Sequence, residues 1–308
     1  MASLSPETPD WLARTLALPG TSRTVEVAGC PIHYLEWGTR GAPGLLFVPA
    51  SAGHAHWYDH VAPLFADQFH VVAIDLSGCG DSGRREVYTT ELIAAEIFGV
   101  CTDAGLLDAA VPPVIVGHSA GAQYAMRAAI AHDDALLGVI TIDGLRYARL
   151  EKDHAVKVLD GERAPPRPPR IYADRDEALA RFRLMPQPLA PIEADAVIAH
   201  IARHSFRAVE GGWAVKYDSA QGATIGLALE LVDALKDLRC RSAAVFSEHT
   251  HLADETAAEV IGAASGGRTV VFTIPGTTHY PMIDSPFAFV AAVKGVVLSW
   301  IAEYRTRG

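Results

Sequence analysis

The chain has 308 residues, of which 50% are hydrophobic, and its formal net charge is -10 at pH 7. This length and apolar content can bury a large core, so we expect one large globular domain or a domain with an insertion. The acidic residues are spread along the chain without any basic block, which argues against a nucleic-acid partner and favours a small-molecule ligand.

The cysteines and the two ends of the chain bear on where the protein works. The sequence has no Cys-x-x-Cys pair, so we expect reduced thiols and neither a zinc knuckle nor a disulfide framework. Residues 1–10 lack the basic region of a secretory signal, and the apolar C-terminal stretch, interrupted by Lys294, is predicted to be too short for a membrane span. We therefore expect a cytoplasmic protein without membrane contact, and whether it forms a homodimer is left open.

The first half of the chain alternates predicted strands with predicted helices. Alternating residues predict an opening hairpin, and short apolar runs bounded by turn residues predict buried strands after it. The predicted strands are Arg23–Val27, Ile32–Trp37, Gly44–Val48, Val71–Ile74, Val114–Val116 and Val139–Ile142. The predicted helices are His56–Ala66, Glu91–Ala104 and Ala120–Ala131. Parallel neighbours need a crossover connection, so this order predicts an α/β fold with a mostly parallel central sheet and helices on both faces.

The alternation stops near Gly144 and resumes after about Gln221. The segment between these points is rich in arginine and proline, with helical patterns at Asp176–Leu184 and Ile192–His204 and a Pro- and Arg-rich run at 164–170 that predicts an extended loop. The pattern after it predicts helices Ile225–Leu238, Asp254–Ala264 and Pro286–Tyr304 and strands Ala243–Ser247 and Thr269–Ile274. We therefore divide the chain into a core at 1–143 and 223–308 and an insertion at 144–222.

One pentapeptide suggests the chemistry. Residues 117–121 read Gly-His-Ser-Ala-Gly, after a predicted strand and before a predicted helix. A serine held on such a sharp strand-to-helix turn needs small neighbours, because its backbone is strained and its hydroxyl projects away from the sheet. We interpret Ser119 as a nucleophile, and expect His118 to pack or form hydrogen bonds beside the turn.

A serine nucleophile needs a base, and the base needs an acid to orient it. His279 follows the last predicted strand in a glycine-led loop, which makes it the candidate base. Asp143 ends an apolar run in which an unpaired carboxylate would be costly, so we prefer it as the acid, with Glu248 as the alternative. We expect no metal and no cofactor, because His249-Thr250-His251 is too short a pair to hold zinc.

From about residue 23 to its end, the chain resembles the α/β-hydrolase superfamily. Besides the pentapeptide, residues 75–83 are similar to the D-x-R-G-x-G-x-S turn of that family and residues 276–286 to its G-x-x-H segment. The resemblance implies that the insertion is a helical cap. It also implies an oxyanion hole made by the backbone N–H of Ala50 or Ser51 together with that of Ala120. The loop that begins at Pro49 lacks the H-G with which the family usually starts it. This departure does not forbid an oxyanion hole, because a backbone donor depends little on side-chain identity.

The resemblance also implies an activity. Relatives that open epoxides or displace halide use an aspartate where this chain has Ser119, so we expect hydrolysis of a carboxylic ester, lactone or thioester of a small hydrophobic molecule through an acyl-enzyme. Carbon–carbon bond hydrolysis of a diketone and a non-catalytic ligand-binding protein remain the alternatives. The candidates for lining a pocket between cap and core are His54, Trp57, Phe182, Met185, Trp213 and Tyr217.

Overall fold

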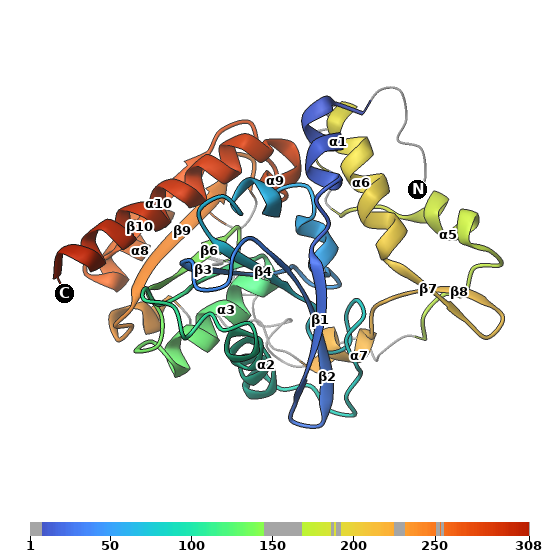
Figure 1. Ribbon diagram of the computed structural model, residues 1–308, viewed down its shortest axis with the longest axis horizontal. Coiled ribbons are helices and arrows are strands. Elements are labelled where there is room, and N and C mark those ends of the chain that lie inside the picture. The colour runs from blue at the N-terminus through green and yellow to red at the C-terminus, as the bar shows by residue number, and fades with distance from the viewer. Residues whose placement is uncertain are drawn as a thin grey trace.

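The computed structural model describes residues 8–144, 168–185, 188, 192–224, 232–250, 253 and 256–307. In this part of the chain, an eight-stranded sheet forms the centre of the molecule (Figure 1). The strand order is β1-β2-β4-β3-β5-β6-β9-β10, with antiparallel pairing at β1–β2 and β2–β4 and parallel pairing elsewhere. The strands are β1 Thr21–Val27, β2 Cys30–Trp37, β3 Gly44–Val48, β4 His70–Ile74, β5 Val114–His118, β6 Gly138–Ile142, β9 Arg241–Ser247 and β10 Thr269–Ile274. The predicted α/β fold with a mostly parallel sheet is confirmed.

Helices cover both faces of this sheet, because its central strands are apolar on both sides. In β3, Leu45 and Phe47 belong to one core cluster and Leu46 and Val48 to the other. The first cluster is closed by the 3-10 helices η1 Ala55–Tyr58 and η2 Ala62–Leu64, by α9 Pro281–Asp284 and by α10 Pro286–Arg307. The second is closed by α2 Thr90–Asp103, α3 Ala120–Ala131, η4 Asp233–Lys236 and α8 Ala257–Ser265.

Several predicted helices differ from the observed ones. The single helix predicted at 56–66 is the pair η1 and η2, which fits the presence of Pro63, since proline lacks an N–H and restricts the residue before it. The prediction also missed a short N-terminal helix, α1 Asp10–Leu16. Of the helix predicted at 225–238, residues 225–231 lie outside the described residues and the rest includes only η4.

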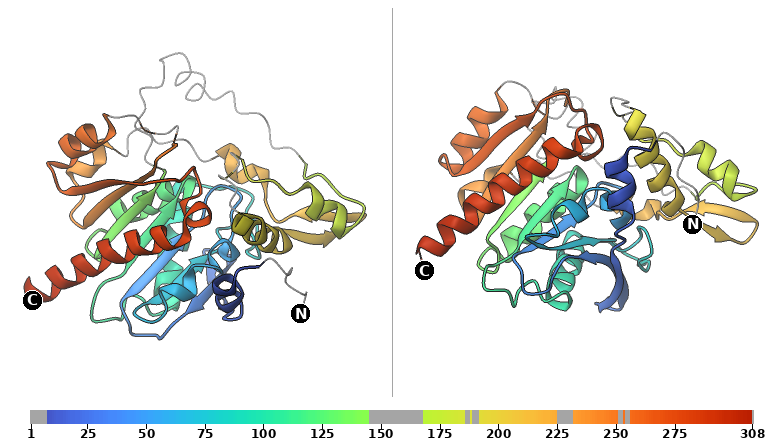
Figure 2. Two further views of the ribbon diagram at one scale, coloured as in Figure 1. Left: turned by 90° about the horizontal axis from the view of Figure 1, so that it is seen from above. Right: turned by 45° about the horizontal axis from the view of Figure 1, so that its top comes forward.

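The inserted segment lies to one side of the main sheet (Figure 2). It contains α5 Arg175–Arg181, α6 Ile192–His204 and the start of α7 Ser219–Thr224. It also contains an antiparallel hairpin, β7 Phe206–Val209 with β8 Gly212–Val215, that the sequence analysis did not predict. The inserted segment therefore combines the predicted helical pieces with a hairpin, and its role as a helical cap stays a prediction. Its boundaries at 144 and 222 stay predictions, and residues 164–167 of the predicted extended loop lie outside the described residues.

The C-terminal helix is longer than predicted. Its part Pro286–Thr306 includes an 18-residue window with a mean hydropathy of 1.5, and it is long and apolar enough, by length and composition alone, to cross a membrane. The prediction that this stretch is too short was wrong, because Lys294 does not interrupt the helix but reaches Asp67, with 2.9 Å between Nζ and Oδ1. Phe289, Val293 and other side chains of α10 pack into the first core cluster, and a core helix passes the same test of length and hydropathy.

Candidate active site

Ser119 occupies a strained turn between β5 and α3. Its φ of 54° is in the left-handed region, which costs a non-glycine residue about 1–3 kcal/mol unless the surroundings enforce it. The enforcement comes from close packing: a Cβ on Gly117 would meet the Gly121 carbonyl oxygen at 2.4 Å, and a Cβ on Gly121 would meet the Pro49 carbonyl oxygen at 2.3 Å. The Ser119 amide donates to the Ile142 carbonyl oxygen at 2.9 Å, which ties the turn to β6.

The three predicted catalytic side chains lie in one hydrogen-bonded chain. His279 Nε2 is 2.8 Å from Ser119 Oγ, and His279 Nδ1 is 2.9 Å from Asp143 Oδ2. Asp143 is fully buried, and its other carboxylate oxygen accepts the Ser247 amide at 3.1 Å. Such an arrangement can hold the imidazole with its Nδ1 hydrogen on the acid, leaving Nε2 free to accept the serine proton.

The alternative acid, Glu248, has a different environment. Its side chain is half exposed, and Oε2 accepts the Gly276 amide at 2.6 Å. Asp143 therefore has the position that the chemistry requires, although its role as the acid stays a proposal. Asp143 itself has a φ of 47°, a second strained position directly after β6 that directs the carboxylate toward His279.

His118 supports the loop that carries the candidate base. Its Nε2 donates to the backbone carbonyl of His279 at 2.6 Å, and the two ring centroids are 5.0 Å apart. Burial, together with the neighbouring His279, lowers the pKa of His118 to about 3, so the ring stays neutral at pH 7. A neutral ring beside the candidate base would avoid a competing positive charge if His279 takes up a proton.

The loop predicted to supply an oxyanion donor lies against the serine turn. The loop contacts the serine turn where Gly121 closely approaches the Pro49 carbonyl oxygen. Within the loop, the Gly53 amide donates a hydrogen bond to the Ala50 carbonyl oxygen at 2.9 Å. Ser51 faces a neighbouring cavity. The assignment of the donors to the amides of Ala50 or Ser51 and of Ala120 stays a prediction.

A cavity of about 360 Å³ adjoins the site. It reaches from Ser51 to Tyr280, the residue that follows His279, and it includes three of the six predicted pocket residues: Trp57, Phe182 and Met185. Leu184, Phe206 and Val215 add to its apolar wall, and Arg181 and Arg183 also line it.

The other three predicted pocket residues do not line this cavity. His54 is buried, with its Nε2 2.8 Å from Ser205 Oγ, and so belongs to the packing between η1 and the end of α6. Trp213 faces the guanidinium of Arg175, which lies 5.6 Å from its ring centroid. Tyr217 forms a β-bridge with Cys79. These three residues are therefore not part of the described lining of this cavity, and their role in a substrate pocket stays a prediction.

Tyr280 is a site residue that the sequence analysis missed. Its ring lies 5.7 Å from that of Trp57, and its hydroxyl donates to the Met185 carbonyl oxygen at 2.8 Å, which links the core to the insertion. Burial raises its pKa to about 12, so the hydroxyl keeps its proton at neutral pH. Its position directly after His279 was the only signal in the sequence.

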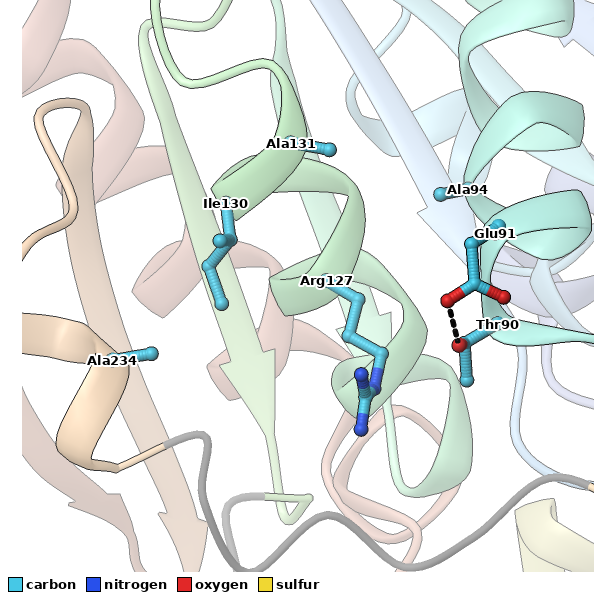
Figure 3. Close-up of a pocket in the computed structure, with 7 residues that line it drawn as sticks. All are labelled: Thr90, Glu91, Ala94, Arg127, Ile130, Ala131 and Ala234. Atoms are coloured by element: carbon cyan, nitrogen blue, oxygen red, sulfur yellow. Dashed lines mark hydrogen bonds between the residues drawn. The ribbon is translucent and has the colours of Figure 1, made fainter.

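A second cavity, of about 280 Å³, lies between α2, α3 and η4 (Figure 3). Glu91 and Arg127 are its charged members, and Thr90 donates to Glu91 across 3.0 Å. Among the described residues that line it there is no serine, cysteine or histidine to act as a nucleophile or base.

The chain resembles known hydrolases. Residues 45–293 match the model of the alpha/beta hydrolase family. Epoxide hydrolase A of Mycobacterium tuberculosis is 30% identical over 148 residues, covering 46% of this chain and 45% of that protein. The 2-(acetamidomethylene)succinate hydrolase of Mesorhizobium japonicum is 25% identical over 279 residues, covering 90% of this chain and 95% of that protein. The match thus spans less than half of the first relative and almost all of the second.

The fold is also similar to that of solved structures. The thioesterase domain from the curacin biosynthetic pathway has a TM-score of 0.71 and 22% sequence identity, with 91% of this chain and 99% of that chain covered.

Proposed function

Because this chain belongs to the α/β-hydrolase family, we propose that it is a serine hydrolase that cleaves a carboxylic ester, lactone or thioester of a small hydrophobic molecule through an acyl-enzyme. The observation that carries this proposal is the hydrogen-bonded chain from Ser119 through His279 to Asp143, with distances of 2.8 and 2.9 Å. The same three groups in other folds activate a serine hydroxyl for attack on a carbonyl carbon.

The proposed reaction has two halves. In the first, His279 Nε2 takes the Ser119 proton as Oγ attacks the substrate carbonyl carbon, and buried Asp143 stabilises the imidazolium. The tetrahedral oxyanion is held by the amides of Ala120 and of Ala50 or Ser51, and it collapses when His279 returns the proton to the leaving oxygen or sulfur. In the second half, His279 activates a water that attacks the acyl group and releases the acid.

The lining of the cavity supports a hydrophobic acyl or alcohol group. Trp57, Phe206 and Tyr280 offer aromatic surface, and the cavity volume of about 360 Å³ is that of a small-molecule site. Part of the wall comes from the inserted segment, through Phe182 and Val215, and this is why we propose that residues 144–222 act as a cap that sets the substrate range.

The epoxide hydrolase relative does not extend its named activity to this chain. The alkyl-enzyme route to epoxide opening needs a carboxylate nucleophile, and the turn here carries the hydroxyl of Ser119, held 2.8 Å from its base. A serine in this position suits acyl transfer, where the hydroxyl adds to a carbonyl and a second attack by water regenerates it.

A second substrate class follows from the charges beside the cavity. Arg181 and Arg183 line it, and both are exposed enough to meet an incoming anion. One relative is named for hydrolysis of a succinate, which carries carboxylates. A substrate with a carboxylate at the far end from its scissile bond is therefore the second candidate.

Burst kinetics on the full chain test the proposal. Chromogenic esters of increasing acyl length, a thioester, a lactone and a diketone would be compared, with and without a terminal carboxylate. We expect a burst of about one equivalent of chromophore from an ester, and loss of both burst and turnover in Ser119→Ala. If Ser119→Ala keeps wild-type turnover, the acyl-enzyme mechanism is wrong, and cleavage of the diketone alone would show that the bond type is wrong.

A further inference from the structure

Three histidines and an aspartate gather where the insertion meets the core. The ligand atoms of His56, Asp59, His200 and His204 all lie within 4.8 Å of one another. His56 and Asp59 come from η1 and the residue after it, and His200 and His204 come from the C-terminal part of α6. This cluster, which we call the joint cluster, contains none of the residues of the Ser119 site.

Helix geometry explains why each pair presents its side chains together. Residues three apart in a 3-10 helix are eclipsed, which places His56 and Asp59 side by side. Residues four apart in an α-helix share a face, which places His200 above His204. The two pairs meet through Asp59, whose Oδ2 lies 2.8 Å from His56 Nδ1 and 2.6 Å from His200 Nε2. The rings of His56 and His204 stack, with centroids 3.7 Å apart.

Internal hydrogen bonds leave part of this cluster unsatisfied. Asp59 is only 8% exposed, and its Oδ1 has no hydrogen-bond partner among the described residues. The ring nitrogens of His204 form no hydrogen bond within the part of the chain that the structure describes. A buried carboxylate oxygen without a donor is costly, so the site calls for a further positively charged or donating group.

We propose that the joint cluster binds a divalent transition metal ion such as Zn²⁺, with His56, Asp59, His200 and His204 as ligands. Three imidazoles and one carboxylate form a donor set that Zn²⁺ accepts, with bonds of about 2.0–2.2 Å in a tetrahedral arrangement. Such bonds hold the ligand atoms about 3.3 Å apart, so a set already within 4.8 Å needs only small side-chain rotations.

Metal binding would change the hydrogen positions but not the backbone. The hydrogens that Nδ1 of His56 and Nε2 of His200 now donate to Asp59 would move to the opposite ring nitrogens, so that the freed lone pairs point at the metal. The side chains of His56 and His200 are 19% and 17% exposed, which gives the ion a path from solvent.

The position of the joint cluster gives the ion a structural effect. It would cross-link η1 to α6, and both elements lead directly to the substrate cavity, through Trp57 next to His56 and Ser205 next to His204. We therefore infer that the bound metal holds the insertion against the core. It takes no part in the chemistry at Ser119.

Metal titration of the full chain, purified without a histidine tag and treated with a chelator, tests this inference. Zn²⁺ binding would be measured by calorimetry against a competing chelator, and Co²⁺ would be added separately to record the visible absorption of a tetrahedral site. His204→Ala is the first variant, because it removes no hydrogen bond within the described residues. His200→Ala and Asp59→Asn follow, with exposed His132→Ala as the matched control.

We expect one Zn²⁺ per chain and a rise in melting temperature with Zn²⁺. His204→Ala and His200→Ala should lose Zn²⁺ affinity by more than about 100-fold, since replacing even a residue that only bonds to a metal ligand costs about 10–100-fold. His132→Ala and Ser119→Ala should bind as the wild type does, which separates this inference from the proposed function. Absence of one-to-one binding to the wild type, or equal binding by His204→Ala and the control, would overturn it.

Discussion

Replacement of Asp143 by asparagine is expected to reduce kcat by about 10⁴-fold while the chain stays folded. The amide oxygen of the new side chain can still accept the Ser247 amide, which now donates to Asp143 Oδ1 at 3.1 Å. The amide NH₂ of that side chain would then face His279 Nδ1 and make it an acceptor. The hydrogen of the imidazole would move to Nε2, where it opposes the proton transfer from Ser119.

The structure supports the size of this effect. Across the 2.9 Å between Asp143 Oδ2 and His279 Nδ1, a unit charge pair at an effective dielectric constant of about 20 gives about 6 kcal/mol. A rate loss of about 10⁴-fold corresponds to about 5.4 kcal/mol. The two values agree because the imidazolium that forms during the reaction faces a fully buried carboxylate.

Steady-state kinetics on the best ester from the substrate screen would measure this loss. Glu248→Gln is the matched control, because Glu248 is half exposed and its Oε2 accepts the Gly276 amide and lies 3.9 Å from His249 Nε2, away from His279 Nδ1, which faces Asp143. We expect its kcat to stay within about twofold of wild type. If Asp143→Asn retains a tenth of the wild-type kcat, or if Glu248→Gln shows the large loss, the choice of acid is wrong. Circular dichroism would check that both variants are folded.

Three other changes give further predictions. Gly121→Ala should lower the free energy of unfolding by about 1–3 kcal/mol or more, because the added Cβ would lie 2.3 Å from the Val48 and Pro49 carbonyl oxygens. Chemical denaturation would measure this loss, and an unchanged midpoint would contradict the packing. Tyr280→Phe should raise KM by about fivefold with little change in kcat, since it removes the hydrogen bond from the Tyr280 hydroxyl to Met185 at the cavity wall, worth about 1 kcal/mol. A fall in kcat alone would argue against a role of Tyr280 in shaping the cavity. The folded pKa of His118, about 3, lies below its ordinary 6.5, so between these pH values the unfolded chain binds a proton that the folded chain does not. Stability should therefore fall as the pH drops through this window, and fall less steeply in His118→Phe; equal slopes would refute the assignment.

Local sequence patterns were enough to predict the sheet and the three residues of the candidate triad. All eight predicted strands are present, because short apolar runs bounded by glycine and proline leave little other choice for a buried segment. Ser119, Asp143 and His279 each follow such a strand, so finding the strands places the residues at one edge of the sheet. Parallel strands present their carboxyl ends at the same edge, which makes this inference a geometric one.

The pocket could not be predicted in the same way. Strands β7 and β8 have only four residues each, too few for alternation to identify them, and the hairpin they form decides that Trp213 faces Arg175 and lies outside the cavity. His54 is buried through a contact with Ser205, far away in the sequence, that no local pattern encodes. The joint cluster has the same origin, because His56-x-x-Asp59 and His200-x-x-x-His204 are each an ordinary pattern until the fold brings them together.

Mass spectrometry after treatment with a fluorophosphonate tests the central claim most directly, that His279 activates Ser119. The reagent phosphonylates a serine only where a base and an oxyanion site activate the hydroxyl. We predict one adduct per chain, located on the peptide that contains Ser119, and its disappearance in His279→Ala. An unmodified Ser119 in the folded wild-type chain, or an adduct that persists undiminished in His279→Ala, would contradict the account.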